Sequence, residues 1–172
     1  MLPPLVLMTD DERLPDPLPA AKALPRGSLV ILRARDAVRR AALAQALLRL
    51  PHIVVLIAGD PALAAELGAD GLHLPESRAR EAAHWRARHP RWLISAARVA
   101  DPHLDFMLLS PVFPTRSHPG RPALGAVRAN ALAKALRIPA YALGGIDARN
   151  ARLLHGFAGI AAIGALDVDD GV

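Results

Sequence analysis

Residues 141–147, with the sequence YALGGID, form an apolar run that ends in two glycines and an aspartate. The apolar residues predict a buried strand over residues 140–143, and Asp147 is a typical N-cap for a helix over residues 147–157. A strand, a tight turn and a helix in this order make up one βα unit of a parallel sheet. The rest of the chain can therefore be searched for repeats of this unit.

The same alternation of strand and helix runs along the whole chain. Seven further apolar runs predict strands, at residues 5–9, 29–33, 53–58, 71–74, 92–96, 106–112 and 159–164. Four further helices are predicted, at residues 36–50 with Asp36 as N-cap, 61–67 beginning with Pro61, 77–89 with Ser77 as N-cap, and 124–137. Eight strands in this order predict an α/β protein with a (β/α)8 TIM barrel, and a doubly wound open sheet is the alternative.

The length of the chain limits how complete this barrel can be. The 172 residues allow one domain, residues 1–172, well below the ~250 residues typical of such barrels. Prolines at positions 15, 17, 19 and 25 leave room only for a short helix over residues 18–24, and residues 98–105 are too few for a full helix. Only residues 165–172 follow the eighth strand. We therefore expect a shortened barrel with reduced first and fifth helices and no eighth helix.

The missing helix predicts exposed apolar surface beside the first and last strands. The outward side chains there belong to the set Leu5, Leu7, Ile160 and Ala162, or to their alternates. A patch of this kind is usually covered. We therefore expect a homodimer, or docking of a partner domain, at this gap.

Composition narrows the class of protein further. The chain has no cysteine, no apparent signal peptide and no apolar run of the ~18 residues that would span a bilayer, so we expect a cytoplasmic protein with no membrane partner. The net charge is +5, but the arginines are dispersed over several predicted helices and aromatic residues make up only 3% of the chain. We therefore expect no nucleic-acid partner.

Paired glycines after the seventh predicted strand indicate a phosphate site. Gly144 and Gly145 allow a ligand to approach the backbone, and the predicted helix after them would add its positive end. Gly164 ends the eighth strand, and the loops after strands seven and eight form the usual phosphate site of a barrel. The alternative is a tight βα turn without a ligand.

Four segments, in order along the chain, resemble the thiamine phosphate synthase and thiazole tautomerase family. They are LMTD at residues 7–10, ADGLHL at 69–74, SPVFPTRSHP at 110–119 and LGGI at 143–146. The resemblance implies a transferase of thiamine biosynthesis that joins hydroxymethylpyrimidine pyrophosphate to thiazole phosphate and releases pyrophosphate, with Mg²⁺ as cofactor. The ligand would be a small phosphorylated heterocycle.

The resemblance also implies roles for individual residues. The thiazole phosphate would lie on Gly144 and Gly145 with help from Gly164, and Thr115 and Ser117 would contact the ligand from the long loop. An anion clamp for the pyrophosphate would consist of Arg33, Arg35 and His118, since one guanidinium group can donate two parallel hydrogen bonds to a phosphate. His73 would lie near the pyrimidine, although an interior histidine bonded to a neighbouring residue is the alternative.

Several family residues are missing on the magnesium side. The positions that align with the two metal carboxylates are Gly59 and Arg78 in this chain. Asp60 and Glu76 lie close by and are weak candidates for metal ligands. Two functions of different classes therefore stay open: a transferase whose activity is impaired, and a non-catalytic module that binds thiazole phosphate or another phospho-ligand for regulation.

Overall fold

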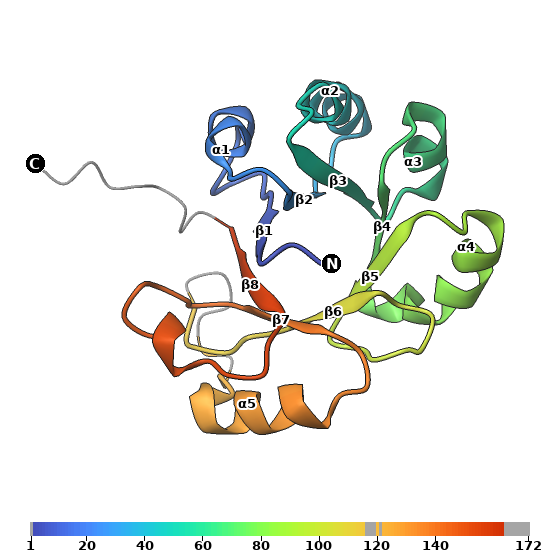
Figure 1. The fold of residues 1–172 in the computed structure, drawn as a ribbon. Helices are drawn as coiled ribbons and strands as arrows, with labels where there is room; N and C mark the ends of the chain where they lie inside the picture. The colour runs from blue at the N-terminus through green and yellow to red at the C-terminus, as the bar shows by residue number, and fades with distance from the viewer. Residues whose placement is uncertain (1, 116–119, 121, 164–172) are drawn as a thin grey trace, which may run out of the picture.

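Eight parallel strands close into a barrel in the computed structural model of the chain, which describes residues 2–115, 120 and 122–163. Each strand pairs with the next, and β8 pairs with β1 through Leu5 opposite Ile160 (Figure 1). The strands are β1 Leu5–Met8, β2 Ser28–Leu32, β3 Ile53–Ala58, β4 Gly71–Leu74, β5 Leu93–Ala97, β6 Phe106–Leu109, β7 Ala140–Leu143 and β8 Gly159–Ala162. The predicted TIM barrel is confirmed, and the open sheet is excluded.

The helices form an incomplete outer ring. They are α1 Leu18–Ala23, α2 Ala37–Leu48, α3 Pro61–Leu67, the 3₁₀ helix η1 Glu76–Glu81, α4 Ala82–Arg88, α5 Gly125–Ala135 and the 3₁₀ helix η2 Ala151–Leu153. In Figure 1, α1 to α4 follow one another around one side of the barrel, and α5 lies on the opposite side. The short first helix and the lack of a helix over residues 98–105 are confirmed. The predicted absence of an eighth helix concerns residues outside those the structure describes.

Two predicted helix starts are wrong. Ser77 does not cap a helix, because η1 begins at Glu76 after Pro75 and has no side-chain cap. The helix predicted from Asp147 does not form. Its carboxylate accepts the N–H groups of Arg149 and Asn150, both at 2.9 Å, while Asn150 Oδ1 accepts the N–H of Asp147 at 2.9 Å. This local exchange of hydrogen bonds competes with a helix, and only η2 follows.

Side chains alternate between the barrel interior and the layer under the helices. The interior cluster includes Met8, Ile31 and Leu108, whereas Leu7 and Ala21 belong to the outer cluster that packs against the helices. The exposure predicted beside the missing helix is wrong for Leu7, which is 0% exposed, and for Ala162, which is 8% exposed. Leu5 and Ile160 are half-buried. No helix among the described residues is long and apolar enough to cross a membrane.

Candidate functional site

The glycine turn after β7 leaves two backbone donors without an acceptor among the described residues. Gly144 and Gly145 have φ angles of 99° and 63°, which non-glycine residues rarely adopt. Their carbonyl groups accept hydrogen bonds, that of Gly144 from the N–H of Phe113 at 3.0 Å and that of Gly145 from Asn150 Nδ2 at 2.8 Å. Their own N–H groups donate to no described residue, and so they are available to an anion.

The loop after β6 packs closely on this turn. A Cβ atom at Gly145 would lie 2.2 Å from the carbonyl oxygen of Pro114 and 2.9 Å from the carbonyl carbon of Phe113. The carbonyl group of Pro114, the residue before the half-buried Thr115, therefore lies against the glycine turn. Ser117, His118 and Gly164 lie outside the described residues.

The helix dipole expected at this turn is missing. Because no α-helix follows β7, an anion at Gly144 and Gly145 would bind to backbone amides without a helix end behind them. The sequence favoured a helix here because Asp147 is a good N-cap. Its carboxylate is instead occupied within the turn of residues 147–150.

His73 is buried in the barrel interior and bonded to a neighbouring strand. Its Nδ1 lies 2.9 Å from Ser95 Oγ, and the two residues are 5% and 0% exposed. Burial, together with the positive charge of Arg33, lowers the pKa of His73 from 6.5 to about 3. His73 is therefore neutral at physiological pH and can exchange hydrogen bonds, but it cannot balance a phosphate charge.

Arg33 follows β2 and lies over the mouth of the barrel. Its backbone is fixed by Thr9, whose hydroxyl accepts the Arg33 N–H at 2.8 Å and donates to the Arg33 carbonyl at 2.9 Å. Its guanidinium donates to the sulfur of Met8, an interior residue, at 3.3 Å. No carboxylate of the described residues lies within 4.0 Å of Arg33, so this cation is open to a ligand.

Arg35 does not share this position. Its side chain is 87% exposed and lies 3.6 Å from Glu12 Oε1, while its N–H donates to Asp11 at 2.9 Å. The structure therefore brings Arg33 and His73 within electrostatic reach of each other, but it ties Arg35 to the loop after β1.

The two weak metal candidates are already engaged. Asp60 Oδ2 lies 2.9 Å from the guanidinium of Arg40, and its Oδ1 accepts the N–H of Leu63 at 3.1 Å as the N-cap of α3. Glu76 lies 3.5 Å from Arg98. Within the described part of the chain, no group of three or more Asp, Glu, His or Cys residues could hold a metal ion.

Arg78, at the position where the resemblance expects the second metal carboxylate, is held from two sides. It donates to both oxygens of Glu81 at 2.6 and 2.7 Å, and to the carbonyl of Gly59 at 2.9 Å. The hydrogen bonds from Arg78 and from Trp85 lower the pKa of Glu81 to about 2. A guanidinium therefore fills the space beside β3, where Mg²⁺ would need an oxygen ligand.

Comparison with known proteins decides the family. The family model described as thiamine monophosphate synthase matches residues 6–166. The chain belongs to this family. A thiamine-phosphate synthase of Thermus thermophilus is 37% identical over 142 residues, which are 75% of this chain and 69% of that protein. Another, of Alcanivorax borkumensis, is 30% identical over 177 residues, which are 92% of this chain and 80% of that protein.

A solved structure shows the same fold as this member of the thiamine monophosphate synthase family. It is the thiamine phosphate pyrophosphorylase from Pyrococcus furiosus, with a TM-score of 0.75 and 20% identity, and the match covers 96% of this chain and 88% of that one. The resemblance seen in the four sequence segments is confirmed, and the related proteins are synthases of the transferase type.

Sequence reasoning missed three residues that shape the site in this family member. Ser95 holds His73, Arg40 holds Asp60 and Arg98 holds Glu76. Arg98 also has a φ angle of 63°, which is unusual for a residue with a side chain. The polar Ser95 within an apolar strand was a usable signal, whereas the two arginine pairings join separate βα units and have no local signal.

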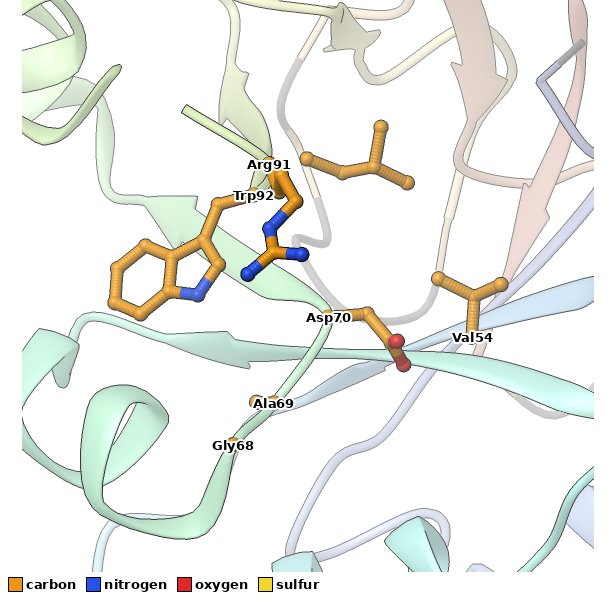
Figure 2. A pocket seen from close by; sticks show the side chains of 7 residues that line it. Val54, Gly68, Ala69, Asp70, Arg91 and Trp92 are labelled. Carbon is orange, nitrogen blue, oxygen red and sulfur yellow. The ribbon is translucent and has the colours of Figure 1, made fainter. Parts of the chain in front are cut away.

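A depression of about 540 Å³ lies at the end of the barrel where the strands begin, away from the carboxyl ends that carry the candidate site. It is lined by residues that precede or begin strands β3 to β5, with the Arg91 side chain pointing into it beside Trp92 and Asp70 (Figure 2). Asp70 has a structural task there, because its Oδ2 accepts the N–H of Val55 at 2.8 Å. Active sites of TIM barrels form at the carboxyl ends of the strands, which is the opposite face.

Proposed function

We propose that this chain is a single-domain transferase of thiamine biosynthesis that makes thiamine phosphate. The thiazole nitrogen forms a bond to the methylene carbon of hydroxymethylpyrimidine pyrophosphate, and the carbon–oxygen bond to pyrophosphate breaks with both electrons leaving on pyrophosphate. Membership of the thiamine monophosphate synthase family supports this proposal. The observation that carries it is the pair of open N–H groups at Gly144 and Gly145, at the carboxyl end of β7.

In this proposal each part of the site binds one part of the substrates. The amides of Gly144 and Gly145 bind the thiazole phosphate, and Gly164, Thr115 and Ser117 contribute to the same subsite. Arg33 receives the pyrophosphate, with Arg35 and His118 as the further members of the clamp that the resemblance implies. The neutral His73 faces the uncharged pyrimidine, where a hydrogen bond rather than a charge is needed.

A second candidate is a regulatory module that binds thiazole phosphate without catalysis. The arginine partners of Asp60 and Glu76 favour it, because they leave no carboxylate free at the positions where the resemblance expects magnesium. Under both candidates the ligand is a small phosphorylated heterocycle, with neither nucleic acid nor a membrane as partner. Formation of a homodimer, or docking of a partner domain, stays a prediction, as does a location in the cytoplasm.

The first experiment separates the two candidates. The full chain is mixed with both substrates, and thiamine phosphate and pyrophosphate are measured together. A transferase gives the two products in equal amounts. Binding of thiazole phosphate in calorimetry without either product supports the module, and no binding of thiazole phosphate contradicts both.

A second experiment tests the glycine turn itself. Substitution of Gly145 is unsuitable, because a Cβ atom there would displace Pro114. Asn150→Asp keeps the shape of the side chain but places a negative charge beside the turn, since Asn150 donates to the Gly145 carbonyl. We expect at least a tenfold loss of affinity for thiazole phosphate, about 1.4 kcal/mol.

Asn130→Asp is the matched control for this variant. Asn130 also makes one bond as donor and one as acceptor, to the Leu153 carbonyl and the His155 N–H, both at 2.9 Å, and neither partner belongs to the glycine turn. We expect the affinity of this variant to stay within twofold of the unaltered chain. Equal affinities in the two variants would place the phosphate elsewhere.

A further inference from the structure

The rim of the barrel after β1 to β4 carries acidic side chains that are nearly all paired with arginine. Six carboxylates lie within 4.0 Å of a guanidinium, in the pairs Asp10–Arg13, Asp11–Arg39, Glu12–Arg35, Asp60–Arg40, Glu76–Arg98 and Glu81–Arg78. Two others accept backbone N–H groups at helix starts: Asp16 from Leu18 and Asp36 from Arg39.

This arrangement does not fit magnesium. Mg²⁺ needs oxygen ligands in near-octahedral geometry and is repelled by a guanidinium beside each carboxylate. Both oxygens of Asp60 are engaged, and Arg78 lies between Gly59 and Glu81. A metal at either aligned position would have to break an ion pair and displace an arginine.

The same arrangement removes the need for a metal. Unpaired carboxylates around a phosphate site repel the ligand unless a cation lies between them, but six of the carboxylates here lie beside an arginine. Arg33 adds a positive charge that no described carboxylate takes up within 4.0 Å. Its guanidinium is planar and can bind two phosphate oxygens at once.

We propose that this chain binds the phosphoryl group of its second ligand directly on Arg33, without a divalent cation. The inference rests on the proposed function in one respect only, the choice of pyrophosphate as the natural form of that group. The ordered backbone supports it, since the Thr9 hydroxyl fixes Arg33 at both its N–H and its carbonyl. The neutral His73 supplies no positive charge, so the charge that attracts the phosphate at this position comes from Arg33.

Calorimetry with sodium pyrophosphate on the full chain tests the proposal. We expect binding in EDTA, and no increase in affinity when Mg²⁺ replaces EDTA. Inorganic phosphate is the second probe, and we expect it to bind in EDTA as well, because the proposal needs only one phosphoryl group on Arg33. Binding that is absent in EDTA, or at least tenfold tighter with Mg²⁺, would overturn it.

Three variants locate the site. Arg33→Met keeps the length of the side chain and removes its charge, and we expect at least a tenfold loss of pyrophosphate affinity. Arg33→Lys keeps the charge but not the two-point contact, and we expect an intermediate loss. Arg80→Met removes an exposed rim arginine without a described ion pair and is the control, expected within twofold. Equal losses for Arg33→Met and Arg80→Met would mean that only overall charge matters and would overturn the assignment.

These results are distinguishable from a failure of the proposed function. The Asn150→Asp experiment tests the thiazole phosphate subsite after β7, whereas the Arg33 variants test the rim after β2. Loss of thiazole phosphate binding with intact, magnesium-independent pyrophosphate binding would refute the proposed function and leave this inference standing. Intact binding of thiazole phosphate, with pyrophosphate binding that requires Mg²⁺, would refute this inference and leave the proposed function standing.

Discussion

The buried His73 makes the stability of the barrel depend on pH. Burial and the charge of Arg33 lower its pKa to about 3 in the folded chain, whereas an exposed histidine has a pKa of about 6.5. The unfolded chain therefore binds a proton at this residue first as the pH falls. The contribution to stability is present above pH 6.5 and is lost as the pH falls from 6.5 towards 3.

The size of this loss follows from the two pKa values. Between pH 6.5 and pH 4.5 the unfolded chain gains most of one proton at residue 73, while the folded chain gains almost none. Integration over this interval gives a loss of about 2 kcal/mol in the free energy of unfolding. The interval ends at pH 4.5, the ordinary pKa of Glu81, so most of the loss from this residue, whose pKa Arg78 and Trp85 lower to about 2, falls below the interval.

Urea unfolding at pH 6.5 and pH 4.5 measures this effect. In His73→Asn the amide can still bond to Ser95 Oγ but cannot titrate, so this variant should lose about 2 kcal/mol less than the unaltered chain between the two pH values. His155→Asn, at an exposed position, should behave as the unaltered chain does. If the unaltered chain and His73→Asn lose the same free energy, His73 is not buried in its neutral form.

Two further predictions concern the strands that carry the rim. Gly71→Ala should destabilise the chain by roughly 1–3 kcal/mol or more in urea unfolding, because its Cβ would lie 2.0 Å from the Leu93 carbonyl oxygen. Asp105→Ala should lower the free energy of unfolding by about 1–3 kcal/mol, because the Asp105 carboxylate accepts the Ile94 N–H at 2.7 Å and pairs with Arg86. The double variant with Arg86→Ala should lose clearly less free energy than the sum of the two single variants. An additive result would show that the pair is not coupled.

Local signals in the sequence predicted the elements that depend on local interactions. Asp36 caps α2 as expected, since its Oδ1 accepts the Arg39 N–H at 2.7 Å, and α3 has the predicted bounds Pro61–Leu67. The helix predicted from Asp147 relied on the same kind of local signal, and this prediction was wrong. An aspartate can cap a helix or close a turn, and the side chain of Asn150 decides for the turn.

The partners of the rim carboxylates could not be predicted, because they depend on the closed barrel. Arg98 follows β5 and Glu76 follows β4, and they meet because these strands pair with Leu74 opposite Ala96. Arg40 lies on α2 and reaches Asp60 after β3. Sequence reasoning placed Asp60 and Glu76 near the metal positions, but the arginines that occupy them come from other βα units.

The two halves of the candidate site depend on different parts of the chain. The glycine turn after β7 offers backbone N–H groups, and these remain whatever side chains surround them, provided that the turn keeps its positive φ angles. The rim after β2 to β4 acts through side chains, so replacing carboxylates at two positions changes its chemistry completely. Arg78 and Arg98 both bring positive charge to this region, and each lies beside a carboxylate, Glu81 and Glu76. The rim therefore presents paired carboxylates and guanidinium groups, and Arg33 lies among them without a carboxylate of the described residues within 4.0 Å.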